Sequence, residues 1–514
     1  MTKHRVIVFK SLIFSIILVI GFTNIYADIG QSNTLTEKSY LQARRVLDRG
    51  IEALGGLAEL TKIVDITIKF NGQSFARHQS VSPEAPYDAL PLEGRLILAL
   101  PRKLALFEQT SNFPGGFSFR FRTLVRGDKG FLLNLTEKTV TPRDPGFINT
   151  VAFSRLPHAT LLTALERAAT LRWLGEEDYE GKRHNVIAFA GSDNVQYTLY
   201  FNAETNLLTK YELLYTDPVA GDAIQEVIFS QYRSAGTVKI PIRRIQKRAG
   251  EVIDDLAYTE VQLNTSPSDN IFATPSDYKE RPMASYPTTV KEIAQGVFTV
   301  GGVGGDNYNI LFVAFKDYIL VIEAPLSSNA AEAAIAKIKE TLPGKPIKYI
   351  VPTHHHNDHS GGMRAFIAEG ATIVTTAGNR RHFERMAAAV RTIAPDALTR
   401  NPHPVLIEPI EGKKRIFTDG SHTVEILNIG PSPHANELLI AYLPQEKILF
   451  QGDLLSVESD LDMQPANDTT VHFAEQIQRQ GLQIEKIIGV HGSIGTMQDL
   501  QTSLERRRVA KRNQ

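Results

Sequence analysis

The arrangement of hydrophobic and polar positions changes near the middle of the chain. In the first half, several segments alternate strictly between apolar and polar residues, which is typical of strands with one buried face. The segment FSFRFRT (117–123) places aromatic side chains on one face and polar ones on the other. In the second half, the solid apolar runs 310–315 and 318–323 are followed by a helical segment at 330–341. That order indicates buried strands in an α/β domain.

The first half is predicted to be one β-rich domain covering residues 28–264. Helical spacing is found at 36–60 and again at 157–174, and NAET (202–205) has the composition of a hairpin turn. We expect a curved antiparallel sheet with a helix laid over its apolar face. The strand-like runs are 66–72, 93–101, 117–125, 131–136, 195–202 and 226–233.

The second half begins after a segment of different composition. Residues 265–287 are rich in Pro, Ser and Asp and show little periodicity, so we predict a linker there and a catalytic domain over 288–514. In that domain a third apolar run, 347–351, leads directly into PTHHHNDHSGG (352–362). Open α/β sheets bind their ligands at the carboxyl ends of strands, which is where this histidine cluster falls.

Residues 1–27 have the pattern of an export signal. A basic start precedes the apolar run SLIFSIILVIGF, and the small residue Ala27 stands before the polar Asp28. We predict cleavage after this segment, with an uncleaved membrane anchor as the alternative, since 11–27 is at the lower limit for spanning a bilayer. Either outcome places the body of the protein outside the cytoplasm, in the periplasm or secreted.

Composition narrows the chemistry that the chain can perform. With 514 residues, the chain is too long for one compact core. Lys plus Arg and Asp plus Glu both number 56, so no overall charge favours binding to nucleic acid. The chain has no cysteine, which excludes disulfides and thiolate ligands. A bound metal ion must therefore use His, Asp or Glu.

Four histidines and an aspartate lie within six consecutive positions, 354–359. His354 and His356 are two residues apart, so on extended backbone they point to the same side and can share one metal ion. Asp358 and His359 follow where the chain turns into a helix, and they face a neighbouring volume. Two ions roughly 3.5–4 Å apart would use both pairs.

Three more residues of ligand type follow strand-like runs later in the chain, at His434, Asp453 and His491. Each alone is most simply a turn residue, and HHHNDH alone also fits a histidine tract on a surface loop. Their shared position at the exits of apolar strands, together with the cluster, favours one metal centre.

With these segments in this order, residues from about 290 to 514 resemble the metallo-β-lactamase fold superfamily, whose His-x-His-x-Asp-His signature falls at 354–359. The resemblance implies an αββα sandwich with two metal ions at the edge of its sheets. The sequence departs from the family at Glu323, where Asp is frequent. The implied ligands are His354, His356 and His434 for one ion, Asp358, His359 and His491 for the other, and Asp453 as the bridge.

Asp453 narrows the expected activity within that family, because zinc β-lactamases usually carry Cys or Ser there and the thioesterase, lactonase and phosphodiesterase branches carry Asp. We expect an exported hydrolase with two Zn²⁺ per chain, or Fe or Mn in their place, that cleaves an ester, lactone, thioester or amide bond. A hydroxide bridging the two ions would be the nucleophile. The alternatives are a β-lactamase-type amidase, an iron-dependent sulfur dioxygenase, and a non-catalytic envelope protein that binds lipids or other ligands.

Other residues near the cluster receive roles in this interpretation. Asp358 is expected to orient the hydroxide and to carry a proton to the leaving group. Tyr308 is a candidate pocket wall or oxyanion donor, and a packed loop tyrosine is the competing interpretation. His355 is expected to be structural, because neighbours on an extended chain point opposite ways, while Asn357 lines the site or braces the loop.

The N-terminal half carries no recognisable catalytic constellation. Its strands and the ALGG helix end (53–56) resemble periplasmic lipoprotein-carrier-like domains, whose curved sheets hold acyl chains. This leaves two roles open: a platform for an apolar ligand beside the active site, or an interface for a homodimer. The expected partner is a small-molecule substrate with an apolar or acyl portion, and membrane association would require an uncleaved export segment.

Overall fold

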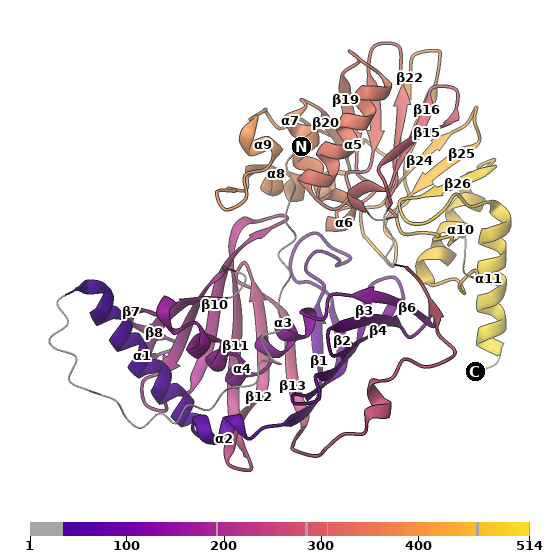
Figure 1. Cartoon of the computed structure of the whole chain (residues 1–514). Helices are drawn as coiled ribbons and strands as arrows, with labels where there is room; N and C mark the ends of the chain where they lie inside the picture. Colours follow the sequence, from indigo (N-terminus) through magenta and orange to yellow (C-terminus); the bar gives the residue numbers. More distant parts are fainter. Residues whose placement is uncertain (1–33, 192–193, 283–285, 306, 459–461, 513–514) are drawn as a thin grey trace.

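A computed structural model of the chain describes residues 34–191, 194–282, 286–305, 307–458 and 462–512. The predicted export segment, 1–27, lies outside these residues. Figure 1 shows a β-rich part, coloured indigo to magenta, and an α/β part, coloured orange to yellow, that lies against it. Among the described helices, none is both long and apolar enough to cross a membrane.

The N-terminal part is built on one 14-stranded sheet, in the order β14-β6-β5-β4-β3-β2-β1-β13-β12-β11-β10-β9-β8-β7. Neighbouring strands are antiparallel except for the parallel pair β6 and β14. The strands are β1 (Asp65–Phe75), β2 (Ala89–Ala99), β3 (Leu104–Phe113), β4 (Phe117–Arg126), β5 (Lys129–Asn134), β6 (Thr139–Arg143), β7 (Arg172–Tyr179), β8 (Lys182–Ala190), β9 (Gln196–Asn202), β10 (Leu208–Asp217), β11 (Gly221–Ala235), β12 (Val238–Arg248), β13 (Glu251–Leu263) and β14 (Lys279–Glu280).

Helices cover one face of this sheet, as the apolar alternation of its strands requires. Ile66 and Ile68 of β1 point into the main core, which also takes Leu47 of α1 and Leu161 of α4. The predicted antiparallel sheet with helical cover is therefore present. The helices of this part are α1 (Leu35–Ala53), α2 (Leu57–Thr61), α3 (Phe147–Phe153) and α4 (Pro157–Glu166), with the short 3-10 turn η1 (Ala168–Thr170).

The structure of this part differs from the sequence expectation at the end of α4 and in the segment 265–287. The helical block predicted over 157–174 is wrong in its last turns, because α4 ends at Glu166 and Arg172 already belongs to β7, which pairs with β8. The segment expected to be a linker also contributes to the N-terminal part. Its 3-10 turn η2 (Asp269–Phe272) buries Phe272 in a second core on the other face of the sheet, and β14 pairs with β6.

The C-terminal part contains two sheets packed face to face. The first has the order β15-β16-β17-β18-β19-β20-β21 and the second the order β22-β23-β24-β25-β26. Their strands are β15 (Thr289–Ala294), β16 (Val297–Gly301), β17 (Ile310–Ala314), β18 (Ile319–Ile322), β19 (Ile347–Val351), β20 (Thr372–Thr375), β21 (Ile407–Pro409), β22 (Lys414–Thr418), β23 (Thr423–Asn428), β24 (Leu439–Leu443), β25 (Ile448–Gln451) and β26 (Lys486–Gly489).

Three apolar layers hold this part together. One cluster, with Leu311 and Phe450, lies between the two sheets. A second, with Phe366, joins the first sheet to its helices, and a third, with Phe473, joins the second sheet to its own. The predicted αββα sandwich is confirmed. Its helices are α5 (Ser328–Thr341), α6 (Asn357–Ser360), α7 (Met363–Ala368), α8 (Arg380–Ala388), α9 (Ala397–Arg400), α10 (Asp468–Gln480) and α11 (Met497–Arg512), with the 3-10 turns η3 (Val303–Gly305) and η4 (Ala377–Asn379).

Two loops of the N-terminal sheet contact the C-terminal part. The backbone carbonyl of Val81, in the β1–β2 connection, accepts a hydrogen bond from the N–H of Asn436 at 2.9 Å. At the tip of the β3–β4 hairpin, the carbonyl of Gly115 accepts a bond from the hydroxyl of Thr469 at 3.1 Å. Gly115 has a φ of +85°, and a Cβ there would collide with Thr469 and press on His434. A side chain would therefore push the hairpin away from the C-terminal domain.

A buried carboxylate anchors the β1–β2 loop. Asp217, at the end of β10, is 1% exposed and pairs with Arg77, and its other oxygen accepts backbone N–H bonds from Val219 and Ala220. Burial alone would raise the pKa of Asp217, but the hydrogen bond and charge of His78, together with Ala220 and Arg77, hold that pKa well below its usual range. The carboxylate is therefore ionised in the folded protein.

Replacing Asp217 by Ala should lower the free energy of unfolding by about 3 kcal/mol, because Arg77 would be left buried without this partner. Urea titration followed by the fluorescence of Trp173, the single tryptophan of the chain, reports on the N-terminal sheet. The control is Asp128→Ala in an exposed turn of the same sheet. Equal midpoints for the two variants would contradict this role of Asp217.

Candidate metal centre

The structure brings together all seven residues that the sequence suggested as ligands. They form two groups that share Asp453, and within each group the ligand atoms lie within 4.8 Å of one another. Six of the seven residues lie in the segments that follow strands β19, β25 and β26, and His434 lies between β23 and β24, which places all of them at one edge of the two sheets. The first group is His354, His356, His434 and Asp453, and the second is Asp358, His359, Asp453 and His491.

The ring nitrogens of the two groups converge on Asp453. Its Oδ2 lies 3.0 Å from Nε2 of His434 and 3.0 Å from Nε2 of His359, and its Oδ1 lies 2.9 Å from Nε2 of His491. Nε2 of His354 faces Nε2 of His434 at 3.2 Å. One carboxylate therefore stands between two sets of imidazoles, as a bridging ligand would.

Hydrogen bonds on the far side of the rings fix their orientation. Nδ1–H of His359 donates to the buried carboxylate of Glu323 at 2.7 Å, so its Nε2 is the nitrogen that faces Asp453. The other oxygen of Glu323 accepts the backbone N–H of Thr353. Nδ1 of His354 is hydrogen bonded to the hydroxyl of Thr353 at 3.0 Å. Glu323 therefore orients His359 and, through Thr353, the loop that carries His354.

His356 gives the clearest test of whether a cation fits here. Its Nε2–H donates to the backbone carbonyl of Ser80, in the N-terminal sheet, at 3.0 Å. That bond leaves Nδ1 as the unprotonated nitrogen, and Nδ1 is buried with no hydrogen-bond partner among the described residues. A buried acceptor without a partner is costly, and a metal ion in the first group would satisfy it.

The electrostatics of the cluster also favour added positive charge. Burial lowers the pKa of His354 and His356, and the neighbouring imidazoles lower it further. Burial would raise the pKa of Asp453, but His359 and His491 hold it well below its usual range. Burial would lower the pKa of His491, yet Asp453 and Asp358 raise it to about 9. The paired carboxylates therefore attract cations.

The N-terminal sheet supplies part of this centre, which sequence reasoning did not anticipate. Besides Ser80, the carbonyl of Pro114 lies 3.4 Å from Nδ1 of His434, and the ring of Phe117 stands edge-on to His434 with centroids 5.2 Å apart. No motif marks these residues, because two of them act through backbone carbonyls that every sequence possesses.

Gln79, next to Ser80, contacts the second group directly. Its side-chain amide donates to Oδ1 of Asp358 at 2.5 Å and to Oδ1 of Asn357 at 3.1 Å. The backbone N–H of Asn357 in turn donates to the carbonyl of His78 at 3.3 Å. Asn357 therefore braces the loop that carries the histidine cluster, which is one of its two expected roles. Gln79 holds Oδ1 of Asp358 away from the cluster, while Oδ2 faces His359 and His491.

The remaining candidate residues take different places. Tyr308 forms an isolated antiparallel β-bridge with His491, and its ring lies edge-on to that imidazole, with centroids 4.5 Å apart. It packs against two cores, as a packed loop tyrosine does, and its ring contact places it beside the second donor group. His355 is buried outside both groups, against the ring of His382 at 5.6 Å, as its structural interpretation predicts.

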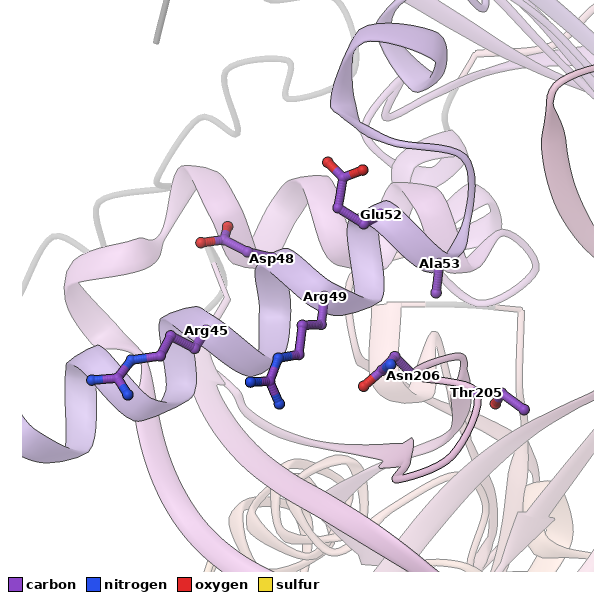
Figure 2. Close-up of a pocket in the computed structure, with 7 residues that line it drawn as sticks. All are labelled: Arg45, Asp48, Arg49, Glu52, Ala53, Thr205 and Asn206. Carbon is purple, nitrogen blue, oxygen red and sulfur yellow. The ribbon is translucent and has the colours of Figure 1, made fainter. Parts of the chain in front are cut away.

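A cavity lies on the N-terminal part, between α1 and the turn after β9. It has a volume of about 450 Å³ and is lined by Arg45 and Arg49 of α1 with Thr205 and Asn206 (Figure 2). None of its lining residues belongs to the two donor groups. It is therefore separate from the centre.

Replacing Gln79 by Ala should weaken metal binding about tenfold, because a lost hydrogen bond to a ligand-type carboxylate typically costs 10–100-fold in affinity. The affinity is measured by titrating metal-free protein with a divalent ion in competition with a chelating dye. Gln73→Ala, an exposed glutamine of β1, is the matched control. Indistinguishable affinities for the two variants would show that Gln79 does not position Asp358.

Comparisons with known proteins agree with this geometry. The sequence model described as the metallo-beta-lactamase superfamily matches residues 303–491. A linear primary-alkylsulfatase from Pseudomonas sp is 32% identical over 78 residues, which are 15% of this chain and 11% of that protein. A hydroxyacylglutathione hydrolase from Bartonella henselae is 29% identical over 151 residues, which are 29% of this chain and 49% of that protein. The chain thus spans less than half of either relative's length.

Solved structures align with somewhat less than half of this chain. A metallo-beta-lactamase from Pontibacter korlensis is 23% identical, with a TM-score of 0.32, and covers 43% of this chain and 99% of its own. The metallo-beta-lactamase FIM-1 from Pseudomonas aeruginosa is 23% identical, with a TM-score of 0.33, and covers 44% of this chain and 97% of its own. The stretch matched by the family model carries Tyr308 and every residue of the two donor groups. Residues 303–491 of this chain therefore carry a domain that matches the metallo-beta-lactamase superfamily.

Proposed function

We propose that this protein is an exported hydrolase with two zinc ions, and that it cleaves an ester, lactone, thioester or amide bond. The observation that carries the proposal is the pair of donor groups that share Asp453. A structural zinc site closes its coordination with four protein ligands. Here seven residues serve two ions, whereas two closed structural sites would need eight, so neither ion has four protein ligands of its own and water or substrate can complete the coordination.

The donor chemistry supports zinc, since imidazole nitrogens and carboxylate oxygens are its usual ligands in the absence of cysteine. When bound, divalent ions of this kind supply Lewis acidity, which lowers the pKa of water towards 7 and polarises a carbonyl oxygen. His354, His356 and His434 would hold one ion, and Asp358, His359 and His491 the other. Asp453 would touch both.

The side chains of this protein would contribute orientation and proton transfer. Burial would raise the pKa of Asp358, but the charge of His359 keeps it well below its usual range, so Asp358 is an ionised acceptor. It would orient the attacking water and accept its proton. The water oxygen then bonds to the carbonyl carbon, the bond to the leaving oxygen, sulfur or nitrogen breaks, and the proton passes to that leaving atom.

Two observations guide the choice of substrate class. Asp453 at the shared position favours the esterase-like branches over β-lactam hydrolysis, and one relative is named a hydroxyacylglutathione hydrolase. A second candidate is hydrolysis of an alkyl sulfate ester, which the 32% identity to a linear primary-alkylsulfatase over 78 residues favours. Carbonyl substrates remain the leading class because the alkylsulfatase match is limited to 15% of this chain.

Export is part of the proposal and rests on residues 1–27. Protein recovered from the producing cells is expected in the periplasmic or extracellular fraction, with Asp28 as its first residue by N-terminal sequencing. An intact N-terminus in the membrane fraction would support the uncleaved anchor instead. An intact N-terminus in the cytoplasm would contradict export.

Replacing Asp358 by Ala should leave the protein folded but remove at least one metal ion per chain and nearly all turnover, because one group loses a terminal donor and the acceptor for water. Metal content is measured by elemental analysis of the purified protein, and folding by circular dichroism. Asp462→Ala, an exposed aspartate of the same domain, is the control. Unchanged metal content and rate in Asp358→Ala would refute the mechanism.

One screen separates the proposed activity from its alternatives. The metal content of the purified protein is measured first, and then turnover of carboxylic esters, lactones, thioesters, amides, phosphodiesters, alkyl sulfates and a chromogenic cephalosporin. Two zinc ions and turnover of a carbonyl substrate support the proposal. Rapid cephalosporin turnover would favour an amidase, one iron with persulfide-dependent oxygen uptake would favour a sulfur dioxygenase, and metal without any turnover would favour a non-catalytic role.

A further inference from the structure

A row of phenylalanines runs along one face of the β3–β4 hairpin. The register of the two strands places residues two apart on the same face, so aromatic side chains of β4 stand opposite alternate residues of β3. The resulting cross-strand pairs are Phe113 with Phe117, Ser111 with Phe119, Gln109 with Phe121 and Phe107 with Thr123. The other face of the same hairpin is polar near its tip, with the ion pair of Arg122 and Glu108.

The rings of this row follow one another from the metal centre outward. Phe117 stands edge-on to His434, and Phe113 stands edge-on to Phe119 with centroids 5.6 Å apart. Phe119 stacks on Phe121 at 6.0 Å, with the two rings nearly parallel. Phe119 is 42% exposed although it lies in the middle of the row. We call this row, from Phe117 to Phe121, the aromatic track.

The track ends in a cavity of about 240 Å³ on the same face of the sheet. The rings of Phe107, Phe121 and Phe147 and the side chain of Leu132 form its apolar walls, and the polar residues that also line it are Gln109, Ser111, Thr123 and Arg143. The guanidinium of Arg143 lies 3.6 Å from the centre of the Phe147 ring. The positive charge of Arg143 therefore interacts with the face of the Phe147 ring. The aromatic rings that line the cavity can still contact apolar groups.

We propose that the aromatic track and its cavity bind the apolar chain of the substrate, while the bond to be cleaved lies at the metal centre. This rests on the proposed hydrolase function and narrows it to substrates with a long unbranched acyl or alkyl chain. Along β3 the cavity extends from Phe107 to Ser111, so its near end lies two residue steps, about 7 Å, from Phe113 at the tip, and its far end lies six steps, about 20 Å, away. A short acyl group at the metal centre would not reach the far end of the cavity.

Water contacts the track at the exposed ring of Phe119 and at the half-buried rings of Phe117 and Phe121. Each apolar group that covers these rings gains free energy, and aromatic faces accept an extended alkyl chain along their length. The hairpin tip is fixed against the C-terminal domain through Gly115 and Pro114, so the track has a fixed position relative to His434. A substrate whose alkyl chain lies along the track would therefore have its head group, with the bond to be cleaved, at the metal centre.

The test measures binding separately from catalysis. Isothermal titration calorimetry of the metal-loaded full chain uses dodecanoate and butanoate as probes, each below its aggregation concentration. We expect dodecanoate to bind at least about tenfold more tightly than butanoate, and Phe119→Ser and Phe121→Ser to weaken dodecanoate binding about tenfold. Leu214→Ser is the matched control, since Leu214 is 53% exposed on β10 of the same sheet and outside the track.

A second measurement uses turnover of p-nitrophenyl dodecanoate and p-nitrophenyl butanoate. The ratio of their kcat/KM values should fall about tenfold in Phe119→Ser and stay at the wild-type value in Leu214→Ser. Thermal unfolding of each variant verifies that it is folded.

The outcomes separate this inference from the proposed function. Equal binding of dodecanoate to the wild type and to both track variants would overturn the track, even if short esters are hydrolysed. Selective loss of dodecanoate binding in the track variants supports the track, even if no ester is turned over and the hydrolase proposal fails. Equal weakening in Leu214→Ser would overturn the track, because binding would then depend on general surface hydrophobicity.

Discussion

The structure depends on one arrangement, in which buried imidazoles and carboxylates meet at the ends of strands. Five histidines and two aspartates in a largely buried site cannot all be satisfied by one another, because like groups repel and Nδ1 of His356 has no partner among the described residues. Metal ions held by the two donor groups would resolve that conflict with fixed positive charge. The sandwich is the scaffold that allows this arrangement, since its two sheets bring four separate segments of the chain to one edge.

The N-terminal sheet is more than an appended domain, because it completes the surroundings of the metal centre. Its carbonyl groups at Ser80 and Pro114 fix the rings of His356 and His434, and Gln79 holds Asp358. Asp217 in turn holds the loop that carries Gln79 and Ser80. A change far from the cluster can therefore alter the metal centre through two hydrogen-bonded steps, which makes the two domains one functional unit.

Much of the fold could be read from the sequence, and the failures have physical causes. Solid apolar runs revealed β17, β18 and β19, and strict alternation revealed β1 and β4. The strand β12 (VKIPIRRIQKR) escaped notice because its charged side chains and Pro241 obscure the alternation, while pairing with β11 and β13 determines its conformation. The helical pattern was predicted up to residue 174, but Arg172 already pairs with β8 as part of a strand. Local periodicity carries no information about such pairing between distant segments.

The sequence alone indicated the seven candidate donor residues, because ligand chemistry depends on residue type and on the ends of recognisable strands, while their grouping around Asp453 followed from the resemblance to the metallo-β-lactamase fold. It also determined the sandwich that presents them. Only the tertiary structure decided what surrounds them. Backbone carbonyls have no sequence signature, and the contact of Gln79 with Asp358 joins residues 279 positions apart. Such contacts arise from the packing of one domain on another, which no local pattern specifies.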